Sequence, residues 1–273
     1  MKNNKLNNTI TNKLLASLLE ISITDIEDQK SCVGSSHTLK TCKIKGDMFF
    51  MKFGADNLFD DINDANIQVG VEYLAYSVYK LYPGVDIPKS IHVVSDAAKG
   101  RVGLATQAVK GSGGSSLSPR TLAKLLTAGV FVDVFIANWD IANMSNVIVT
   151  SDQEKAVRID PGGALTFRAQ GGRKGSKFNV SAGELKTMLH PSYGGAGYVF
   201  QYADLAEAAR TFMPVPWSSV EAALKEAGSY VATEFANAGL STDAWEEEVA
   251  NITSILKVRH AVVTKHCEFV LGQ

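Results

Sequence analysis

The sequence predicts an α+β fold of two lobes, in which a β-rich N-terminal lobe contains one helix and the C-terminal lobe is mainly helical. Short β-like runs separated by turn residues lie on both sides of a single helical stretch in the first part of the chain. Beyond a glycine and serine run, apolar residues recur instead at helical spacing. We expect an N-terminal polar segment with a short helix at residues 1–29, an N-lobe at 30–110, a Gly/Ser linker at 111–118 and a helical C-lobe at 119–273.

Composition limits the classes of partner. The chain has 273 residues, of which 27 are basic and 28 acidic, so a net charge of −1 creates no overall field for nucleic acid. We therefore expect no nucleic-acid partner. No segment approaches the roughly 20 apolar residues of a membrane helix, which argues against stable membrane insertion. The three cysteines are odd in number and form no Cys-x-x-Cys pair, a pattern that fits a reducing compartment.

The start of the chain is rich in asparagine and lysine. The run Met1–Ile10 lacks the layout of a cleaved secretory signal, so we interpret it as a frayed polar terminus. The alternative is a non-cleaved export signal of the kind found on bacterial effectors. We accordingly expect a cytoplasmic protein, with secretion by a bacterium into the cytosol of a host cell as the alternative.

The elements of the N-lobe follow from alternation and turn signals. β-like runs are predicted at residues 31–36, 38–44, 48–53, 90–94 and 101–109. Between the third and fourth of these runs, apolar residues at helical spacing predict an amphipathic helix that carries Glu72 and ends before Pro83.

The C-lobe begins after a glycine-rich connection. The run Gly111–Ser116 lacks the Lys-Ser/Thr ending of a phosphate-binding loop, and its context does not match the dinucleotide fingerprint, so a linker is predicted. Ser118 and Pro119 predict the start of a helix that continues to about Ala137.

Five polar residues stand out within or beside apolar elements. Lys52 interrupts an apolar strand, and Glu72 is the natural carboxylate partner on the helix that follows. Asp140 lies near the end of an apolar helix, and Asn146 directly precedes a predicted strand. Asp160 follows two short β-like runs and is itself followed by Pro-Gly-Gly. A lysine with its partner, a base-like carboxylate and two metal ligands in this order are what kinase-type folds use for phosphoryl transfer.

Each of these residues also has a simpler explanation when taken alone. Lys52 is a residue type that protects sheet edges, Asp160 is common in turns, and Glu72 suits a solvated helix face. The order and spacing of all of them together favour a functional site.

Over roughly residues 30–200 the chain resembles the atypical protein kinases. The resemblance rests on a glycine-serine turn, Lys52, Glu72, the Gly-rich linker, Asp140 within Asn-Trp-Asp, and Asp160 within Asp-Pro-Gly-Gly. It is similar to the HipA-like, actin-fragmin-kinase-like and phosphatidylinositol 3- and 4-kinase-like branch, in which Asn-Trp-Asp or Gly-Asp replaces His-Arg-Asp. The resemblance implies a two-lobed protein kinase-like fold with ATP and Mg²⁺ as cofactors.

The resemblance also implies a role for each matched residue. Lys52 would bind the ATP phosphates and be held by Glu72, and Asp140 would orient the acceptor hydroxyl or accept its proton. Asn146 and Asp160 would hold magnesium. The nucleotide is expected between the lobes, with contacts from Gly34, Ser35 and Ser36 to the phosphates and from Thr106, Gln107, Ala108 and Val109 to the adenine. Catalysis in such a site is mainly positioning and neutralisation of charge.

One position departs from the pattern of these kinases. The amide ligand usually lies five residues after the catalytic aspartate, but residue 145 is Ser, with Asn143 at plus three and Asn146 at plus six. Asn146 directly precedes the predicted strand, as such a ligand should, which favours a one-residue insertion in the loop. Asn143 stays an alternative.

A basic stretch at residues 165–178 follows the second aspartate as an activation segment would. It contains Arg168, Arg173, Lys174 and Lys177 and no acidic residue. This pattern predicts a cationic platform for an acidic or phosphorylated protein substrate, an inositol phosphate, or a phosphorylated side chain of the chain itself. The alternative is an ordinary solvated basic loop.

We therefore expect an ATP- and Mg-dependent phosphotransferase to an alcohol group, in the simplest case a protein serine/threonine kinase. The alternatives are a phosphatidylinositol or small-molecule kinase, a nucleotidyl (AMP) transferase on the same fold, and a non-catalytic pseudokinase that serves as a binding module. The intact Lys52, Glu72, Asp140 and Asp160 argue against the pseudokinase.

Overall fold

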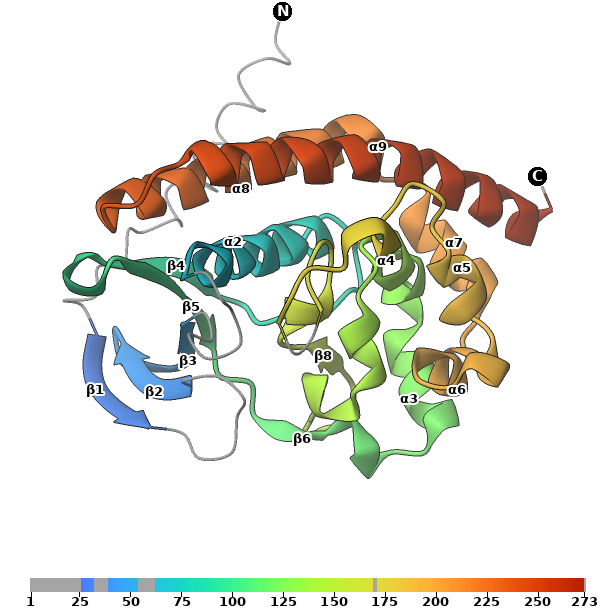
Figure 1. Ribbon diagram of the computed structural model, residues 1–273. Coiled ribbons are helices and arrows are strands. Elements are labelled where there is room, and N and C mark those ends of the chain that lie inside the picture. The colour runs from blue at the N-terminus through green and yellow to red at the C-terminus, as the bar shows by residue number, and fades with distance from the viewer. Residues whose placement is uncertain (1–25, 32–38, 54–61, 169–170, 273) are drawn as a thin grey trace, which may run out of the picture.

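The chain folds into two lobes, with a pair of C-terminal helices running across both (Figure 1). The computed structural model describes residues 26–31, 39–53, 62–168 and 171–272. The expected short helix before residue 26 lies outside the described residues.

The N-lobe is built on an antiparallel sheet with the strand order β1-β2-β3-β5-β4. Its strands are β1 (Ile26–Ser31), β2 (Leu39–Ile44), β3 (Asp47–Phe53), β4 (Ile91–Asp96) and β5 (Arg101–Gln107). β1 ends at Ser31, where the first β-like run was expected to begin, and the rest of that run lies outside the described residues. Because β3 is flanked by strands on both sides, Lys52 is not at a sheet edge, and the edge-protection alternative is wrong.

Side chains of β3 alternate between the two faces of the sheet. Phe49, Met51 and Phe53 are buried on one face. Lys52 points to the other face, opposite Leu104 of β5. The period of two residues along a strand therefore places the lysine on the side of the sheet where the helix of the N-lobe lies.

Helix α2 (Ile62–Tyr79) is buried almost all round, so the prediction of an amphipathic helix is wrong. One face packs on the sheet, and the other is covered by α8 (Trp217–Asn237) and α9 (Asp243–Leu271) (Figure 1). A Cβ atom at Gly70 would lie only 2.6 Å from the ring of Trp245, so glycine is what allows α9 to approach this closely. A helix covered on both sides needs apolar residues all round.

The glycine-rich connection between the lobes is ordered. Gly111–Gly113 forms strand β6, which pairs with β7 (Val147–Thr150), and β7 pairs with β8 (Ala156–Arg158). A Cβ atom at Gly111 would lie 2.0 Å from the carbonyl oxygen of Val149. The glycine at this position therefore allows two backbones to approach closely.

The C-lobe starts where the sequence indicates. Ser118 Oγ accepts a hydrogen bond from Thr121 N at 3.2 Å and caps α3 (Pro119–Leu126). The expected single helix to about Ala137 is interrupted after α3 by a 3₁₀ turn, and α4 (Val130–Phe135) follows. The remaining helices of this lobe are α5 (Glu184–Thr187), α6 (Ala196–Phe200) and α7 (Leu205–Phe212).

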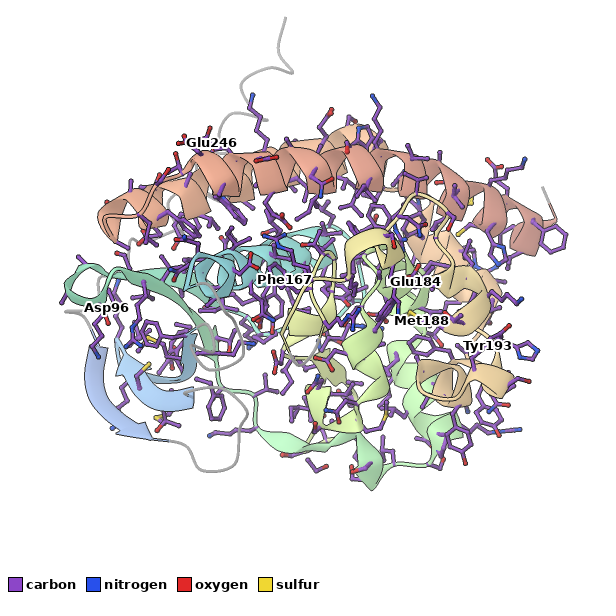
Figure 2. The ribbon with its side chains drawn as sticks, in the orientation of Figure 1. Asp96, Phe167, Glu184, Met188, Tyr193 and Glu246 are labelled. Atoms are coloured by element: carbon purple, nitrogen blue, oxygen red, sulfur yellow. The ribbon has the colours of Figure 1, made fainter. Side chains whose placement is uncertain are left out.

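One hydrophobic core extends through both lobes. Figure 2 shows Phe167 in the interior, where it is fully buried, and Tyr193 at the outer edge of the C-lobe, where it is 52% exposed. Cys42 and Cys267 are buried free thiols. Within the described ranges, no helix combines the length and the apolar character needed to cross a membrane.

Candidate active site

Lys52 lies between two carboxylates. Its Nζ atom is 2.6 Å from Oε2 of Glu72 on α2 and 2.5 Å from Oδ1 of Asp160, which follows β8. Glu72 is buried, whereas the side chain of Asp160 is 41% exposed. The fold thus brings together three residues that the sequence places on a strand, a helix and a turn.

The site carries more negative than positive charge. Burial raises the pKa of Glu72 to about 7, with Lys52 opposing and Asp160 adding to the shift. Burial alone would lower the pKa of Lys52, but Asp160 and Glu72 outweigh it and raise the pKa overall, so the lysine stays protonated. Burial, together with the charge of Asp160, raises the pKa of Asp140 to about 6. A cation bound near these carboxylates would offset their mutual repulsion.

Asp140 lies in the 3₁₀ turn η5 (Trp139–Ala142), just beyond α4. Asn138 caps this turn, because its Oδ1 atom accepts a hydrogen bond from Asp140 N at 3.2 Å. The charges of Asp160 and Lys52 both act on the Asp140 carboxyl group. This loop is therefore close to the group formed by Lys52, Glu72 and Asp160.

Asn143 and Asn146 have different surroundings. Asn143 is exposed, and its Oδ1 atom accepts hydrogen bonds from the backbone N of Ser145 at 3.2 Å and from its Oγ at 2.7 Å. It caps the 3₁₀ turn η6 (Met144–Asn146). Asn146 is buried, directly precedes β7, and donates through Nδ2 to the carbonyl oxygen of Asp140 at 3.3 Å.

The segment Asp160-Pro-Gly-Gly is more than a surface turn. Asp160 adopts the left-handed conformation, with φ 49° and ψ 60°, before the 3₁₀ turn η7 (Pro161–Gly163). A Cβ atom at Gly162 would lie 3.2 Å from Asp160 Oδ1, 3.3 Å from Glu72 Oε2 and 3.4 Å from Lys52 Nζ. Glycine therefore lets the backbone pass directly beside the charged group.

A cavity of ≈ 290 Å³ opens beside Lys52. Its lining combines polar residues around the lysine with apolar residues from both lobes, namely Glu72, Tyr76, Asp160, Phe50, Leu104, Ile148 and Ile159. Of the expected adenine contacts, Thr106, Gln107 and Val109 line this cavity and Ala108 does not. Gly34, Ser35 and Ser36 lie outside the described residues. A concave, mostly apolar space with a few polar groups is typical of a small-molecule site.

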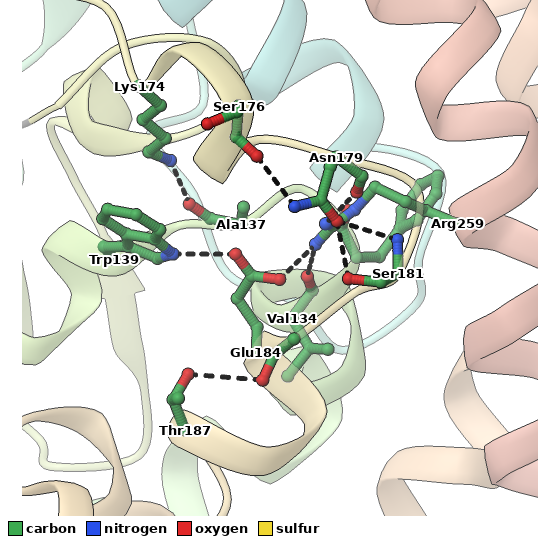
Figure 3. Close-up of polar contacts among 12 residues, drawn as sticks. Val134, Ala137, Trp139, Lys174, Ser176, Asn179, Ser181, Glu184, Thr187 and Arg259 are labelled. Atoms are coloured by element: carbon green, nitrogen blue, oxygen red, sulfur yellow. Dashed lines mark hydrogen bonds and ion pairs between the residues drawn. The ribbon is translucent and has the colours of Figure 1, made fainter.

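Lys174 is not part of an exposed platform. It is 2% exposed, and its Nζ atom donates to the carbonyl oxygen of Ala137 at 2.6 Å and lies 4.5 Å from the centre of a Trp139 ring (Figure 3). Burial lowers its pKa to about 7. Lys174 thus attaches the segment after Asp160 to the loop that carries Asp140.

The other three cations of this segment also differ from one another. Arg173 forms ion pairs with Asp64 of α2 at 2.7 Å and with Glu248 of α9 at 2.6 Å. Arg168 and Lys177 are exposed. The expectation of four clustered cations therefore does not match the structure, because two of the four bind groups of the protein itself.

An ion pair beneath the Asp140 loop was not identified from the sequence. Glu184 Oε1 accepts a hydrogen bond from Trp139 Nε1 at 2.9 Å, and Glu184 Oε2 pairs with Arg259 Nη2 at 2.9 Å (Figure 3). Arg259, on α9, also donates to the carbonyl oxygens of Val134 and Phe135 at the end of α4. These contacts support the loop from below, and no local pattern in the sequence indicates them.

The donor atoms present fit a shared magnesium ion. In the part of the chain that the structure describes, no group of three or more His, Cys, Asp and Glu side chains is arranged to hold a metal by itself. Asp160 and Asn146 offer carboxylate and amide oxygens, and Mg²⁺ is typically bound by one or two carboxylates together with substrate phosphates. These residues fit a metal that enters with a nucleotide, not a closed protein cage.

The arrangement of a sheet, a helix that carries Glu72, and a mainly helical second lobe is a kinase-like two-lobed fold. Among solved structures, the chain is similar to the crystal structure of the Helicobacter pylori proinflammatory kinase CtkA, with 11% sequence identity and a TM-score of 0.50. The alignment covers 91% of this chain and 98% of that one. No family model matches the chain, and no curated protein matches it in sequence.

Proposed function

We propose that this protein is an ATP- and magnesium-dependent phosphotransferase that acts on a hydroxyl group. The observation that carries the proposal is the contact of Lys52 with both Glu72 and Asp160 at the wall of a cavity. A lysine held by one buried carboxylate can bind phosphate oxygens, and a second, more exposed carboxylate can share a metal ion with them. The kinase-like fold supports the same function.

The cavity suggests how a nucleotide would bind. The adenine would lie among the apolar lining residues beside Val109, five residues along the chain from Leu104, which pairs with Lys52. The backbone N–H groups of Gln107 and Ala108 already donate to other carbonyl oxygens, at 2.9 and 2.8 Å. Val109 N–H would therefore be the donor to the purine edge. The phosphates would extend toward Lys52, whose positive charge would stabilise their negative charge.

The proposed reaction is a direct phosphoryl transfer. The acceptor hydroxyl oxygen forms a bond to the γ-phosphorus while the bond from that phosphorus to the β–γ bridging oxygen breaks, and ADP leaves. The proton of the hydroxyl passes to the carboxylate of Asp140. Lys52 stabilises the charge on the phosphate oxygens, and Glu72 holds the lysine in place.

Asp160 and Asn146 would hold the magnesium ion. Bound there, Mg²⁺ would offset the negative charge of the β- and γ-phosphates. Asn146 is preferred over Asn143 because it lies beside Asp140, whereas the Oδ1 atom of Asn143 already accepts two hydrogen bonds.

The proposed acceptor is a serine or threonine of a protein. The Asn-Trp-Asp sequence around Asp140 supports a place in the atypical HipA-like and phosphatidylinositol-kinase-like branch. Arg168 and Lys177 are exposed, whereas Arg173, although also exposed, forms ion pairs with Asp64 and Glu248. Arg168 and Lys177 are therefore the residues of this segment that would contact an acidic or phosphorylated acceptor.

The test is transfer of label from γ-labelled and, separately, α-labelled ATP to the proteins and lipids of a cell lysate in the presence of magnesium. We expect protein labelling from γ-labelled ATP alone. Lys52→Ala and Asp160→Ala should each abolish labelling and retain the circular dichroism spectrum, because both changes remove charge without removing core volume. Lys155→Ala is the matched control, since Lys155 is 57% exposed and pairs with Asp86, and neither residue lines the cavity.

Other outcomes would contradict the proposal in specific ways. Labelling from α-labelled ATP would indicate a nucleotidyl transferase, and labelling of lipids alone would indicate a lipid kinase. Binding of ATP with no transfer to any acceptor would indicate a pseudokinase. Full activity of Lys52→Ala or Asp160→Ala would remove the assigned role of that residue.

A further inference from the structure

Helix α2 carries a polar stripe along one face. Gln68, Glu72, Tyr76 and Tyr79 lie at spacings of four, four and three residues, which places them on one side of a helix. Most other residues of this helix are buried and apolar. Each member of the stripe contacts a different part of the candidate active site: Gln68 Nε2 lies 3.5 Å from the carbonyl oxygen of Gly162, and Glu72 pairs with Lys52.

Tyr76 contacts the backbone of the proposed metal-binding aspartate. The N–H group of Asp160 donates to the Tyr76 hydroxyl at 2.9 Å, and Tyr76 is 1% exposed. Asp160 has a positive φ, a conformation that costs a residue with a Cβ atom about 1 kcal/mol or more and that persists only where the surroundings hold it. The hydrogen bond that the Tyr76 hydroxyl accepts from Asp160 N is such a constraint.

Tyr79 contacts the loop that carries Asp140. Its hydroxyl donates to Asp133 Oδ1 and accepts from Asn138 Nδ2 at 2.8 Å. Asn138 in turn accepts from the backbone N of Asp140 at 3.2 Å. Asp133 is itself fixed by a buried ion pair with Arg158 at 2.8 Å. The tyrosine is therefore held at one end and orients the amide that caps the Asp140 turn.

We propose that Tyr76 and Tyr79 are positioning residues through which α2 sets the geometry of Asp160 and Asp140 separately. This inference rests on the proposed phosphotransferase function, which it deepens. Through Tyr76 the helix places the metal-site carboxylate, and through Tyr79 it places the carboxylate that faces the acceptor. Together with Glu72, one rigid element thus aligns the lysine, the metal ligand and the base.

A purely structural role would not require these partners. Tyr82, just beyond the end of α2, also has a buried hydroxyl, and among the described residues that hydroxyl has no hydrogen-bond partner. The ring of Tyr82 stacks on Phe212 with centroids 5.3 Å apart. The core therefore tolerates a tyrosine that serves only as an aromatic ring, whereas Tyr76 and Tyr79 use their hydroxyls on the site.

The first experiment compares Tyr76→Phe with wild type and with Tyr82→Phe, each of which loses one buried hydroxyl and keeps the ring. In Tyr76→Phe, we expect the magnesium concentration for half-maximal transfer to rise about tenfold, because the N–H of Asp160 loses its partner. We also expect faster amide hydrogen exchange at Asp160 in the protein without nucleotide. Tyr82→Phe should match wild type in both measurements.

The two measurements separate failure of this inference from failure of the proposed function. Wild-type protein without magnesium-dependent transfer would contradict the function, and the exchange rate would still decide the role of Tyr76. Unchanged exchange at Asp160, or an unchanged magnesium requirement in an active protein, would overturn the role of Tyr76. An equal change in Tyr82→Phe would overturn it as well.

The second experiment uses Tyr79→Phe. We expect kcat to fall about tenfold, because Asn138, which caps the Asp140 turn, loses its hydrogen bond to the Tyr79 hydroxyl. The magnesium requirement should stay as in wild type. Asp133 keeps its ion pair with Arg158, so the thermal midpoint should fall little. A wild-type kcat, or a shift in magnesium requirement instead of kcat, would overturn the separate assignment of Tyr79.

Discussion

The immediate surroundings of a side chain decide what it can bind. The Oδ1 atom of Asn143 accepts from both the backbone and the hydroxyl of Ser145, and the residue is exposed. Asn146 is buried and donates through Nδ2 to the carbonyl oxygen of Asp140, and its Oδ1 atom accepts a longer hydrogen bond from Ser145 Oγ at 3.5 Å. Sequence spacing leaves both residues open as metal ligands, whereas their hydrogen bonds favour Asn146.

Replacing each asparagine by alanine tests this difference. We expect Asn146→Ala to raise the magnesium concentration needed for half-maximal transfer by about tenfold or more, because changes in the ligand environment of a metal typically cost 10–100-fold in affinity. Asn143→Ala should leave the requirement near that of wild type. The measurement is a magnesium titration of labelled transfer at saturating ATP. A requirement shifted only by Asn143→Ala would move the assignment to Asn143.

At the scale of one element, the basic segment after Asp160 has a structural as well as a surface role. Arg173 ties it to α2 and α9, and Lys174 ties it to the Asp140 loop. Arg168 and Lys177 are left exposed. The segment is thus anchored by half of its cations, and the other half faces solvent.

The depressed pKa of Lys174 predicts a pH-dependent stability. Its pKa of about 7 lies below the ordinary lysine value, so between these two values the unfolded chain binds more protons than the folded one. The free energy of unfolding should therefore rise with pH from about 7 upward, by at most ~1.4 kcal/mol per pH unit from this group. Below about pH 7 the lysine is charged in both the folded and the unfolded chain, so burying its charge lowers the free energy of unfolding by the full amount.

The measurement is urea unfolding of wild type, Lys174→Met and Lys177→Met between pH 6 and pH 9, a range that spans ~1 unit below to ~2 units above the Lys174 value. We expect the stability of wild type relative to Lys174→Met to increase with pH over this range. Lys177 is exposed, so Lys177→Met should run parallel to wild type. A difference in the free energy of unfolding between wild type and Lys174→Met that stays constant across this pH range would contradict a lowered pKa of Lys174.

At the scale of the whole molecule, the two lobes share one core. α8 and α9 follow the C-lobe helices α3 to α7 in the sequence, yet they pack on α2 of the N-lobe (Figure 1). Gly70 lies directly under Trp245, whose Nε1 donates to the carbonyl oxygen of Gly228 at 2.9 Å. The helix that carries the polar stripe is therefore fixed from behind by the last helix of the chain.

This packing predicts a specific loss of stability. Gly70→Ala should lower the free energy of unfolding by about 1–3 kcal/mol, because its Cβ atom overlaps the fixed ring of Trp245. Trp245→Leu in the same chain should recover part of that loss, so the two changes should not be additive. Gly183→Ala is the control, since nothing lies within 4 Å of the added atom. Additive losses at positions 70 and 245 would show that the two residues do not interact.

Local patterns were enough to predict much of the fold. The alternation and helical spacing that set the N-lobe strands and α2 depend on a few neighbouring residues, and so does the Ser118 cap of α3. The same is true of the order Lys52, Glu72, Asp140, Asp160 along the chain. Lys52 and Glu72 could be paired from the sequence because Lys52 is the one charged residue in the apolar run at 48–53 and Glu72 is the only carboxylate of the next helix after Asp64.

Contacts between distant segments decided the rest. Whether Lys174 is buried depends on the loop around Trp139, and whether α2 is amphipathic depends on helices more than a hundred residues later. Tyr76 and Tyr79 resemble ordinary core tyrosines until Asp160 and Asn138 are placed against them. Periodicity indicates which side of an element is apolar, but the partner of a buried polar group is set by the tertiary packing that removes it from water.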